Sequence, residues 1–210
     1  MIRLPRRKAA ALVAAAVLTL ALLPGRAALA LEPEAAKSFV AGAVDDAMAT
    51  FAGKSLSRED RGARLRDTIT RYADPGVTAA DVLGRHWDKA SADERQRFKA
   101  TLVDYVVATW SGSLSDIDPA VRITVSGADA KGDRVVVHTV ATQPNEPPSN
   151  VDWLIASDAT GRTIAIDVNV GGVSLTDTMK ADFTAVLRAN SGQMEALLAA
   201  MAKKIAAQPK

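Results

Sequence analysis

The chain of 210 residues contains no cysteine, two histidines and only nine aromatic residues. Without cysteine it can form neither disulfides nor a thiolate zinc site, and two histidines supply few further ligands for a metal. The patterns G-x-S-x-G, G-x-x-x-x-G-K-[ST], G-x-G-x-x-G and H-E-x-x-H are also missing. The common signatures of hydrolases, nucleotide-binding enzymes and zinc proteases are therefore absent, and we expect neither a metal nor a cofactor.

The first thirty residues have the pattern of a secretory signal peptide. A basic start precedes an apolar run over residues 9–23, and Ala28-Leu29-Ala30 fits an A-x-A cleavage site. The apolar run of 15 residues is shorter than a membrane-spanning helix requires. We therefore expect export with cleavage after Ala30, which leaves residues 31–210 as a single domain.

Removal of this segment changes the sign of the net charge. The whole chain has 26 basic and 24 acidic residues, a net charge of +2. The first thirty residues hold five of the basic residues and none of the acidic ones, so the remainder has 21 basic and 24 acidic residues, a net charge of −3. The basic character belongs to the signal segment, and we expect no nucleic-acid partner.

Helical periodicity occupies both ends of the exported part. Apolar residues recur at spacings of three and four, which predicts helices over 34–53, 57–72, a short segment from 75, 91–112, and two segments around 179–187 and 194–205. Ser91 and Glu94 form the clearest capping box. The helix at 91–112 is apolar around much of its circumference, so we expect neighbours on more than one side of it.

Between residues 119 and 170 the period changes to two. Alternating apolar residues predict four strands, near 121–125, 135–141, 151–155 and 164–170, joined by short links rich in Gly, Pro, Asn and Asp. Short links favour antiparallel neighbours. The order of elements predicts an α+β fold, a four-stranded antiparallel meander with helices packed on one face.

The apolar residues that recur along the predicted helices and strands allow two interpretations. One is an ordinary solid core, and the other is a core split by an apolar cavity with the 91–112 helix in its wall. The residues that would line such a cavity share the inward face of the strands or lie on that helix. They are Tyr105, Trp110, Val121, Ile123, Val137, Thr139, Trp153, Ile155, Ile166 and Val168.

Neither histidine has the partners that an active site requires. His86 lies beside Trp87 just before the 91–112 helix, and the nearby Asp88 is no more than the local density of aspartate provides. We interpret this stretch as a packing joint. His138 is out of phase with the apolar residues of its strand, so a pair with a neighbouring aspartate would face away from the cavity. We expect no catalytic residues.

Two separated motifs resemble those of the MlaC-like, or toluene-tolerance, family. They are LGRHW at 83–87 with SADERQRF at 91–98, and GVSL at 172–175 followed by Phe183 and a final amphipathic helix. The order of helices and strands agrees with the family over residues 34–206. Two motifs with the right elements between them make the resemblance specific.

The resemblance implies an NTF2/cystatin-like fold and a periplasmic phospholipid carrier, with the acyl chains held between sheet and helices. The implied partners are phospholipid as cargo, an inner-membrane ABC transporter with an MCE subunit, and an outer-membrane lipoprotein complex. The implied role is the maintenance of outer-membrane lipid asymmetry. We expect a monomer. An acyl chain of about 16 carbons represents roughly 12 kcal/mol of burial at ~0.8 kcal/mol per CH₂, so a carrier must enclose it.

The sequence departs from the family pattern at two places. Gly161-Arg162 stands where the family often has a tryptophan, and Asn169-Val170-Gly171 lacks the usual acidic residue. A paralogue for another lipid, such as a hopanoid-associated member, is therefore one alternative. An NTF2-like cavity enzyme is a second, and it predicts a polar pair inside the pocket. An interaction module with a solid core is a third.

Overall fold

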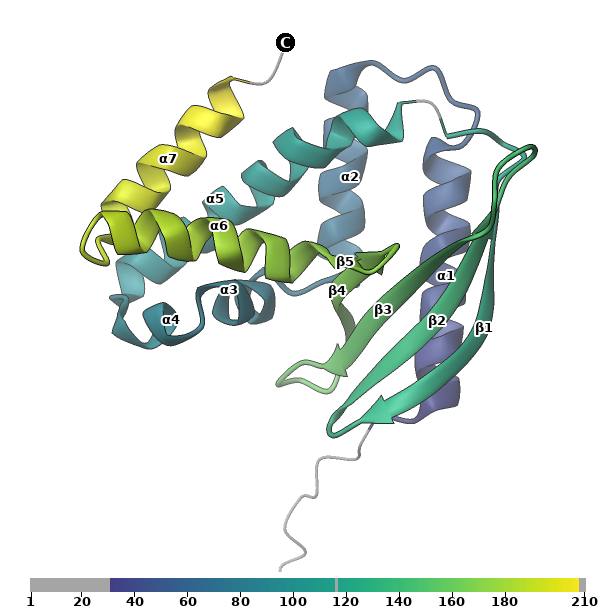
Figure 1. The fold of residues 1–210 in the computed structure, drawn as a ribbon, viewed down its shortest axis with the longest axis horizontal. Coiled ribbons are helices and arrows are strands. Elements are labelled where there is room, and N and C mark those ends of the chain that lie inside the picture. The colour runs from purple at the N-terminus through teal and green to yellow at the C-terminus, as the bar shows by residue number, and fades with distance from the viewer. Residues whose placement is uncertain (1–30, 116, 208–210) are drawn as a thin grey trace, which may run out of the picture. The chain divides into compact units, whose positions relative to one another are not determined.

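The computed structural model describes residues 31–115 and 117–207, so the expected signal segment lies outside the described residues. Helices and strands follow one another in the expected order (Figure 1). The elements are α1 Pro33–Phe51, α2 Arg58–Tyr72, α3 Pro75–Leu83, α4 Arg85–Lys89, α5 Ala92–Trp110, the 3₁₀ turn η1 Ser111–Leu114, β1 Arg122–Lys131, β2 Arg134–Thr142, β3 Ser149–Ser157, β4 Thr163–Val170, β5 Val173–Ser174, α6 Leu175–Ala189 and α7 Met194–Ala206.

The helix starts follow from local side-chain chemistry. Ser91 caps α5 by accepting a hydrogen bond from the amide of Glu94, whose carboxylate accepts one from the amide of Ser91. This confirms the predicted capping box. Ser57 caps α2 and Asp74 caps α3 through side-chain acceptors alone, each satisfying amide groups that a helix leaves unpaired in its first turn.

The sheet is an antiparallel meander in the order β1-β2-β3-β4-β5, which confirms the predicted α+β class. The structure adds a fifth strand, the two-residue β5, to the four expected from periodicity. Gly171 and Gly172 both have positive φ, of 59° and 91°, and they turn the chain tightly enough for Val173 to pair with Val170. A two-residue strand is too short for alternation to reveal, which is why the sequence did not predict it.

Helix α1 packs along β1 and β2 on one face of the sheet (Figure 1). Val40 and Val44 from α1 meet Val137 from β2 and Ile155 from β3, and all four are buried. Strand β2 alternates as predicted, and Val137 lies opposite Trp153 with both pointing to this face. Register shifts interrupt the alternation between Val125 and Gly127 and between Leu154 and Ile155, so the predicted row of β4 does not keep to one face. This half of the sheet face is a filled core.

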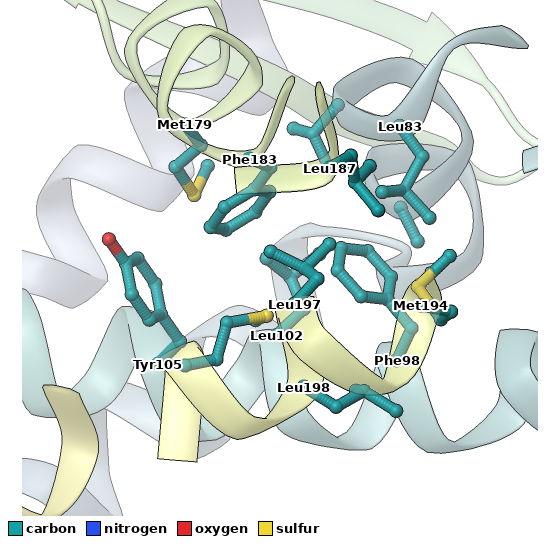
Figure 2. Close-up of a cluster of buried hydrophobic side chains, with 13 residues drawn as sticks. Leu83, Phe98, Leu102, Tyr105, Met179, Phe183, Leu187, Met194, Leu197 and Leu198 are labelled. Atoms are coloured by element: carbon teal, nitrogen blue, oxygen red, sulfur yellow. The ribbon is translucent and has the colours of Figure 1, made fainter. Parts of the chain in front are cut away.

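Helices α3 to α7 lie beside the β4 edge and share a second core (Figure 1). Figure 2 shows its aromatic centre, where Phe98 of α5 meets Phe183 of α6 edge-on at 5.8 Å between ring centroids. Tyr105 packs against the same Phe183 ring at 5.3 Å. Helix α5 therefore has neighbours on several sides, as its wide apolar surface predicted.

Candidate functional site

An apolar groove of about 400 Å³ lies between the second half of the sheet and helices α2 and α5. Its floor comes from β3 and β4, its walls from α2 and α5, and its ends from the starts of α3 and α6 and from η1. The lining residues are Leu65, Thr68, Ile69, Tyr72, Ala73, Pro75, Thr78, Leu102, Val103, Val106, Trp110, Ser113, Leu114, Trp153, Ala165, Ile166, Asp167, Val168, Leu175, Thr176 and Met179.

Helix α5 forms a wall because two of its faces are apolar. Phe98 and Tyr105 point into the core shared by α3 to α7. Val103 and Trp110 lie on another face and line the groove, and both are half-buried. The same helix therefore builds a packed core on one side and an unfilled apolar surface on the other.

The floor of the groove depends on a polar contact behind Trp153. The indole Nε1 donates a hydrogen bond to Thr139 Oγ1 at 3.1 Å, and that hydroxyl donates to the carbonyl of Val151 at 2.7 Å. The one polar atom of the indole is thus satisfied within the sheet. The apolar ring is left to border the groove.

Helix α2 forms one wall of the groove. Polar contacts with neighbouring helices hold it in place along the solvent-exposed edge of the groove, which we call the rim. None of its fifteen residues is buried, although Leu65, Ile69 and Tyr72 line the groove. Along the rim, Arg66 forms an ion pair with Asp104 of α5 at 2.6 Å. Exposed ion pairs contribute little to stability, so this wall is held weakly compared with a helix that is packed into a core.

Further contacts of α2 join it to α1, in addition to a hydrogen bond from Arg61 to the carbonyl of Ser111 in η1 and one from Arg162 to the carbonyl of Arg71. Asp46 accepts hydrogen bonds from the Arg71 guanidinium at 2.8 Å and from the Tyr72 hydroxyl at 2.5 Å. The Tyr72 and Arg71 hydrogen bonds lower the pKa of Asp46, and the hydrogen bond to Asp46 raises the pKa of Tyr72. The carboxylate therefore stays charged and the phenol neutral around neutral pH, so the hydrogen bonds that join α2 to α1 are kept there.

The one carboxylate in the groove lining has a structural role. Asp167 accepts a hydrogen bond from Ser174 Oγ at 2.5 Å and from the amide of Thr176 at 2.9 Å. Both carboxylate oxygens are thus used to hold the β4–β5 turn against the start of α6.

His138 lies on the opposite face of the sheet from the groove, as the alternation predicted. Its Nδ1 lies 2.8 Å from Asp152 and its Nε2 lies 3.0 Å from Asp129. Hydrogen bonds to these two carboxylates raise the pKa of His138. A polar hollow of about 450 Å³ occupies the same face and is lined by Asp152 but not by His138.

The stretch around Trp87 packs as a joint. Trp87 is half-buried against the core shared by α3 to α7, with the Arg95 guanidinium 5.2 Å from the centroid of its ring. The Arg95 side chain also donates a hydrogen bond to the carbonyl of Trp87 at 2.9 Å. These contacts tie α4 to the first turns of α5.

Four of the ten residues expected in a cavity wall line the groove: Trp110, Trp153, Ile166 and Val168. Whether they contact a ligand stays a prediction.

The other six do not line the groove. Val137, Thr139 and Ile155 face the predicted side, but α1 covers that half of the sheet, so they are core residues. Tyr105 is buried in the core shared by α3 to α7, where its hydroxyl accepts a hydrogen bond from Lys204. The last two border a separate shallow hollow beside η1: Val121 and Ile123.

Several lining residues were not on the predicted list. Leu65, Ile69 and Tyr72 form the apolar stripe of α2, which the sequence revealed as a stripe but not as a wall. Val103 lies in the second apolar row of α5, beside Trp110. Both rows were visible as periodicity, but periodicity does not say which helix faces empty space.

Within residues 31–115 and 117–207, no group of three or more His, Cys, Asp or Glu side chains is placed to hold a metal ion. No helix in that part of the chain is both long enough and apolar enough to span a membrane.

Comparison with known proteins agrees with the fold and the motifs. Residues 41–203 match the family model described as MlaC protein. Among solved structures, a phospholipid-binding protein from Ralstonia solanacearum, determined in complex with a phospholipid, superposes with a TM-score of 0.72 at 23% sequence identity. The match covers 83% of this chain and 99% of that one, so the two share one fold. The search of curated proteins gave no significant match.

Proposed function

The chain belongs to the MlaC family, and we propose that it carries phospholipid, with an acyl chain held in the groove between α2, α5 and the sheet. The observation that carries this proposal is an apolar hollow of about 400 Å³ lined mostly by aliphatic and aromatic side chains. The solved structure of similar fold is that of a phospholipid-binding protein. Carriage needs no acid, base or metal, and no enzymatic activity is proposed.

The size of the groove corresponds to a single acyl chain. A methylene group occupies about 30 Å³, close to the share of a water molecule in the liquid, so a volume of about 400 Å³ accommodates roughly 13 methylenes. At ~0.8 kcal/mol per buried CH₂, such a chain gains about 10 kcal/mol relative to water. A second chain of a diacyl lipid needs a similar volume again, which α2 would provide by moving outward.

The weak fastening of α2 makes it the wall that admits the lipid. Its groove side is apolar, none of its residues is buried, and its ion pairs with α1 and α5 are exposed. Breaking these contacts exposes little core, whereas moving α1 would uncover the buried valines of the first core. Lipid entry therefore proceeds between α2 and α5.

We infer the cellular location and the partners of this lipid transport from the family and from the first thirty residues. The protein is exported to the periplasm with cleavage after Ala30, folds as one lipid-binding domain over residues 31–210, and acts as a monomer. It exchanges phospholipid with an inner-membrane ABC transporter that contains an MCE subunit and with an outer-membrane lipoprotein complex. This shuttling maintains outer-membrane lipid asymmetry.

The experiment is lipid extraction and native mass spectrometry of the protein purified from a bacterial periplasm. The expected result is co-purified phospholipid at about one molecule per chain. Recovery of a hopanoid or another lipid class would change the identity of the proposed cargo but would still support a lipid carrier. A protein that is consistently empty, and that takes up no phospholipid from vesicles, would contradict the proposal.

A matched pair of variants locates the cargo. Val103→Asp places a charge on the groove wall, and Val173→Asp places the same charge on β5, where the valine is 59% exposed. Burying an unpaired carboxylate against hydrocarbon is strongly unfavourable. We expect Val103→Asp to lose its lipid while Val173→Asp retains it.

A further inference from the structure

A second hollow, of about 350 Å³, lies at the far end of the helices that flank the sheet. It is bordered by α4, the first turn of α5, the end of α6 and the turn that leads to α7, which lie together at one end of the molecule in Figure 1. The hollow is built partly from the motif at residues 83–98, whose histidine has no part in the lipid groove.

The hollow is separate from the lipid groove. Leu187 and Met194 line the hollow, whereas Met179 lines the groove. Figure 2 shows Met179 and Met194 on opposite sides of the aromatic centre formed by Phe98 and Phe183. Because this packed core lies between them, an acyl chain in the groove does not reach the hollow.

Three positive charges border the hollow without a counter-ion. Arg85, Lys89 and Arg188 are exposed, and none forms a hydrogen bond or ion pair with another residue in the described part of the chain. The one acidic residue in the lining is Glu94, and its carboxylate accepts the capping hydrogen bond from Ser91 at 2.7 Å. Like charges gathered around one concavity repel each other and attract an anion.

The imidazole of His86 borders the same hollow. Its Nε2 is buried and has no hydrogen-bond partner among the residues that the structure describes. Burial lowers the pKa of His86, and the charges of Arg85, Lys89 and Arg188 lower it further. Buried polar atoms in native proteins are nearly always satisfied, so this unpaired nitrogen is an exception, and its burial places it behind the surface of the hollow.

We propose that this hollow binds a phosphate-type oxyanion, with Arg85, Lys89 and Arg188 supplying the charge and the imidazole of His86 lying at its edge. Guanidinium groups match the oxygens of phosphate in pairs, and a lysine adds a point charge. The phosphate belongs either to a free ion or to a phospholipid headgroup at a membrane surface. The site does not depend on the lipid groove, so each proposal can fail alone.

The experiment is a histidine-imidazole NMR titration of the exported chain, residues 31–210. The chain has only two histidines, and His138 lies on the sheet, away from the hollow, so it serves as an internal control. Inorganic phosphate is added at constant ionic strength, with chloride as the reference anion. We expect a saturable shift of the His86 resonances. A tenfold coupling between anion binding and protonation raises the pKa of His86 by about one unit and leaves that of His138 unchanged.

Two variants assign the charges. The double variant Lys89→Gln/Arg188→Gln removes two of the three cations and should abolish the saturable shift. Arg64→Gln makes the same kind of change on the exposed face of α2 and should leave it intact. A shift of the same size in the double variant, or an equal shift of both histidines, would overturn the proposal.

Vesicles distinguish the two sources of phosphate. If headgroups are the source, phosphatidylglycerol vesicles retain the protein in a flotation assay, and Lys89→Gln/Arg188→Gln is not retained. If the free ion is the source, inorganic phosphate shifts His86 and no vesicle retention is seen. Absence of both responses, or binding of an acidic peptide alone, contradicts the site.

Discussion

Helices α1 and α2 both lie against the sheet, but they cover it in different ways. Helix α1 buries five residues, among them Val40 and Val44, which press against β2 and β3. Helix α2 buries none of its residues and faces the floor of the groove. One half of the sheet face is therefore a solid core, and the other half borders the groove in which we propose that an acyl chain is held.

The largest expected effect is a difference in stability between the two halves. Ile155 lies fully buried under α1, at 0% exposure, whereas Ile69 is a half-buried residue of α2. Ile155→Ala should lower the free energy of unfolding by about 2–5 kcal/mol, because it leaves a cavity in the core. Ile69→Ala should cost less than about 1 kcal/mol. Urea denaturation of the lipid-free protein measures both. Equal losses would remove the distinction between core and wall.

A pair of glycines sharpens the comparison. A Cβ on Gly62 of α2 would lie 3.3 Å from Val107 Cγ1 of α5, whereas a Cβ on Gly42 of α1 would meet nothing within 4 Å. Gly62→Val should therefore push α2 away from α5 and speed lipid release to acceptor vesicles severalfold. Gly42→Val makes the same substitution on α1 and should leave the release rate unchanged. Unaltered release from Gly62→Val would mean that α2 is not the moving wall.

A smaller effect is expected from the rim. Asp46→Asn weakens the contacts of this residue with both Arg71 and Tyr72. Because these groups are largely exposed, thermal stability should change little, but lipid release should become measurably faster. Asp93→Asn removes a partner of Arg97 at the other end of α5 and is the control. If both variants release lipid at the wild-type rate, the rim contacts do not hold the wall.

The smallest effect concerns pH and the outer face of the sheet. Because the folded-state pKa of His138 is raised by Asp152 and Asp129, the protonated imidazole stabilises the folded protein. This contribution is fully present below the ordinary pKa of about 6.5 and is lost as the pH rises through the raised value. We expect the stability difference between wild type and His138→Gln to shrink as the pH rises above about 6.5, measured by urea unfolding. If the stability difference between wild type and His138→Gln instead grew with pH, the protonated imidazole would not be the stabilising form.

Much of the fold could be predicted because its signals are local. The capping residues Ser57, Asp74 and Ser91 each begin a helix, and alternation placed Val137 and His138 on the correct faces. The site was harder, because alternation identifies a face and not what covers it. Val137 and Val168 point to the same side of the sheet, yet one lies under α1 and the other borders the groove.

The wall formed by α2 was missed for a related reason. Leu65, Ile69 and Tyr72 make a narrow apolar stripe on an otherwise charged helix, and such a stripe is typical of any helix on a protein surface. Only the tertiary arrangement reveals that this stripe faces empty space. The strand β5 was missed because two residues carry no periodicity.

The most direct test of the central claim is quenching of tryptophan fluorescence by phospholipids with brominated acyl chains. Trp110 and Trp153 line the groove, whereas Trp87 packs at the far end of the helices. Variants that retain a single tryptophan, with phenylalanine at the other two positions, separate the three signals. We predict strong quenching of Trp110 and of Trp153 and none of Trp87. Equal quenching of all three, or quenching of Trp87 alone, would contradict an acyl chain held between α2, α5 and the sheet.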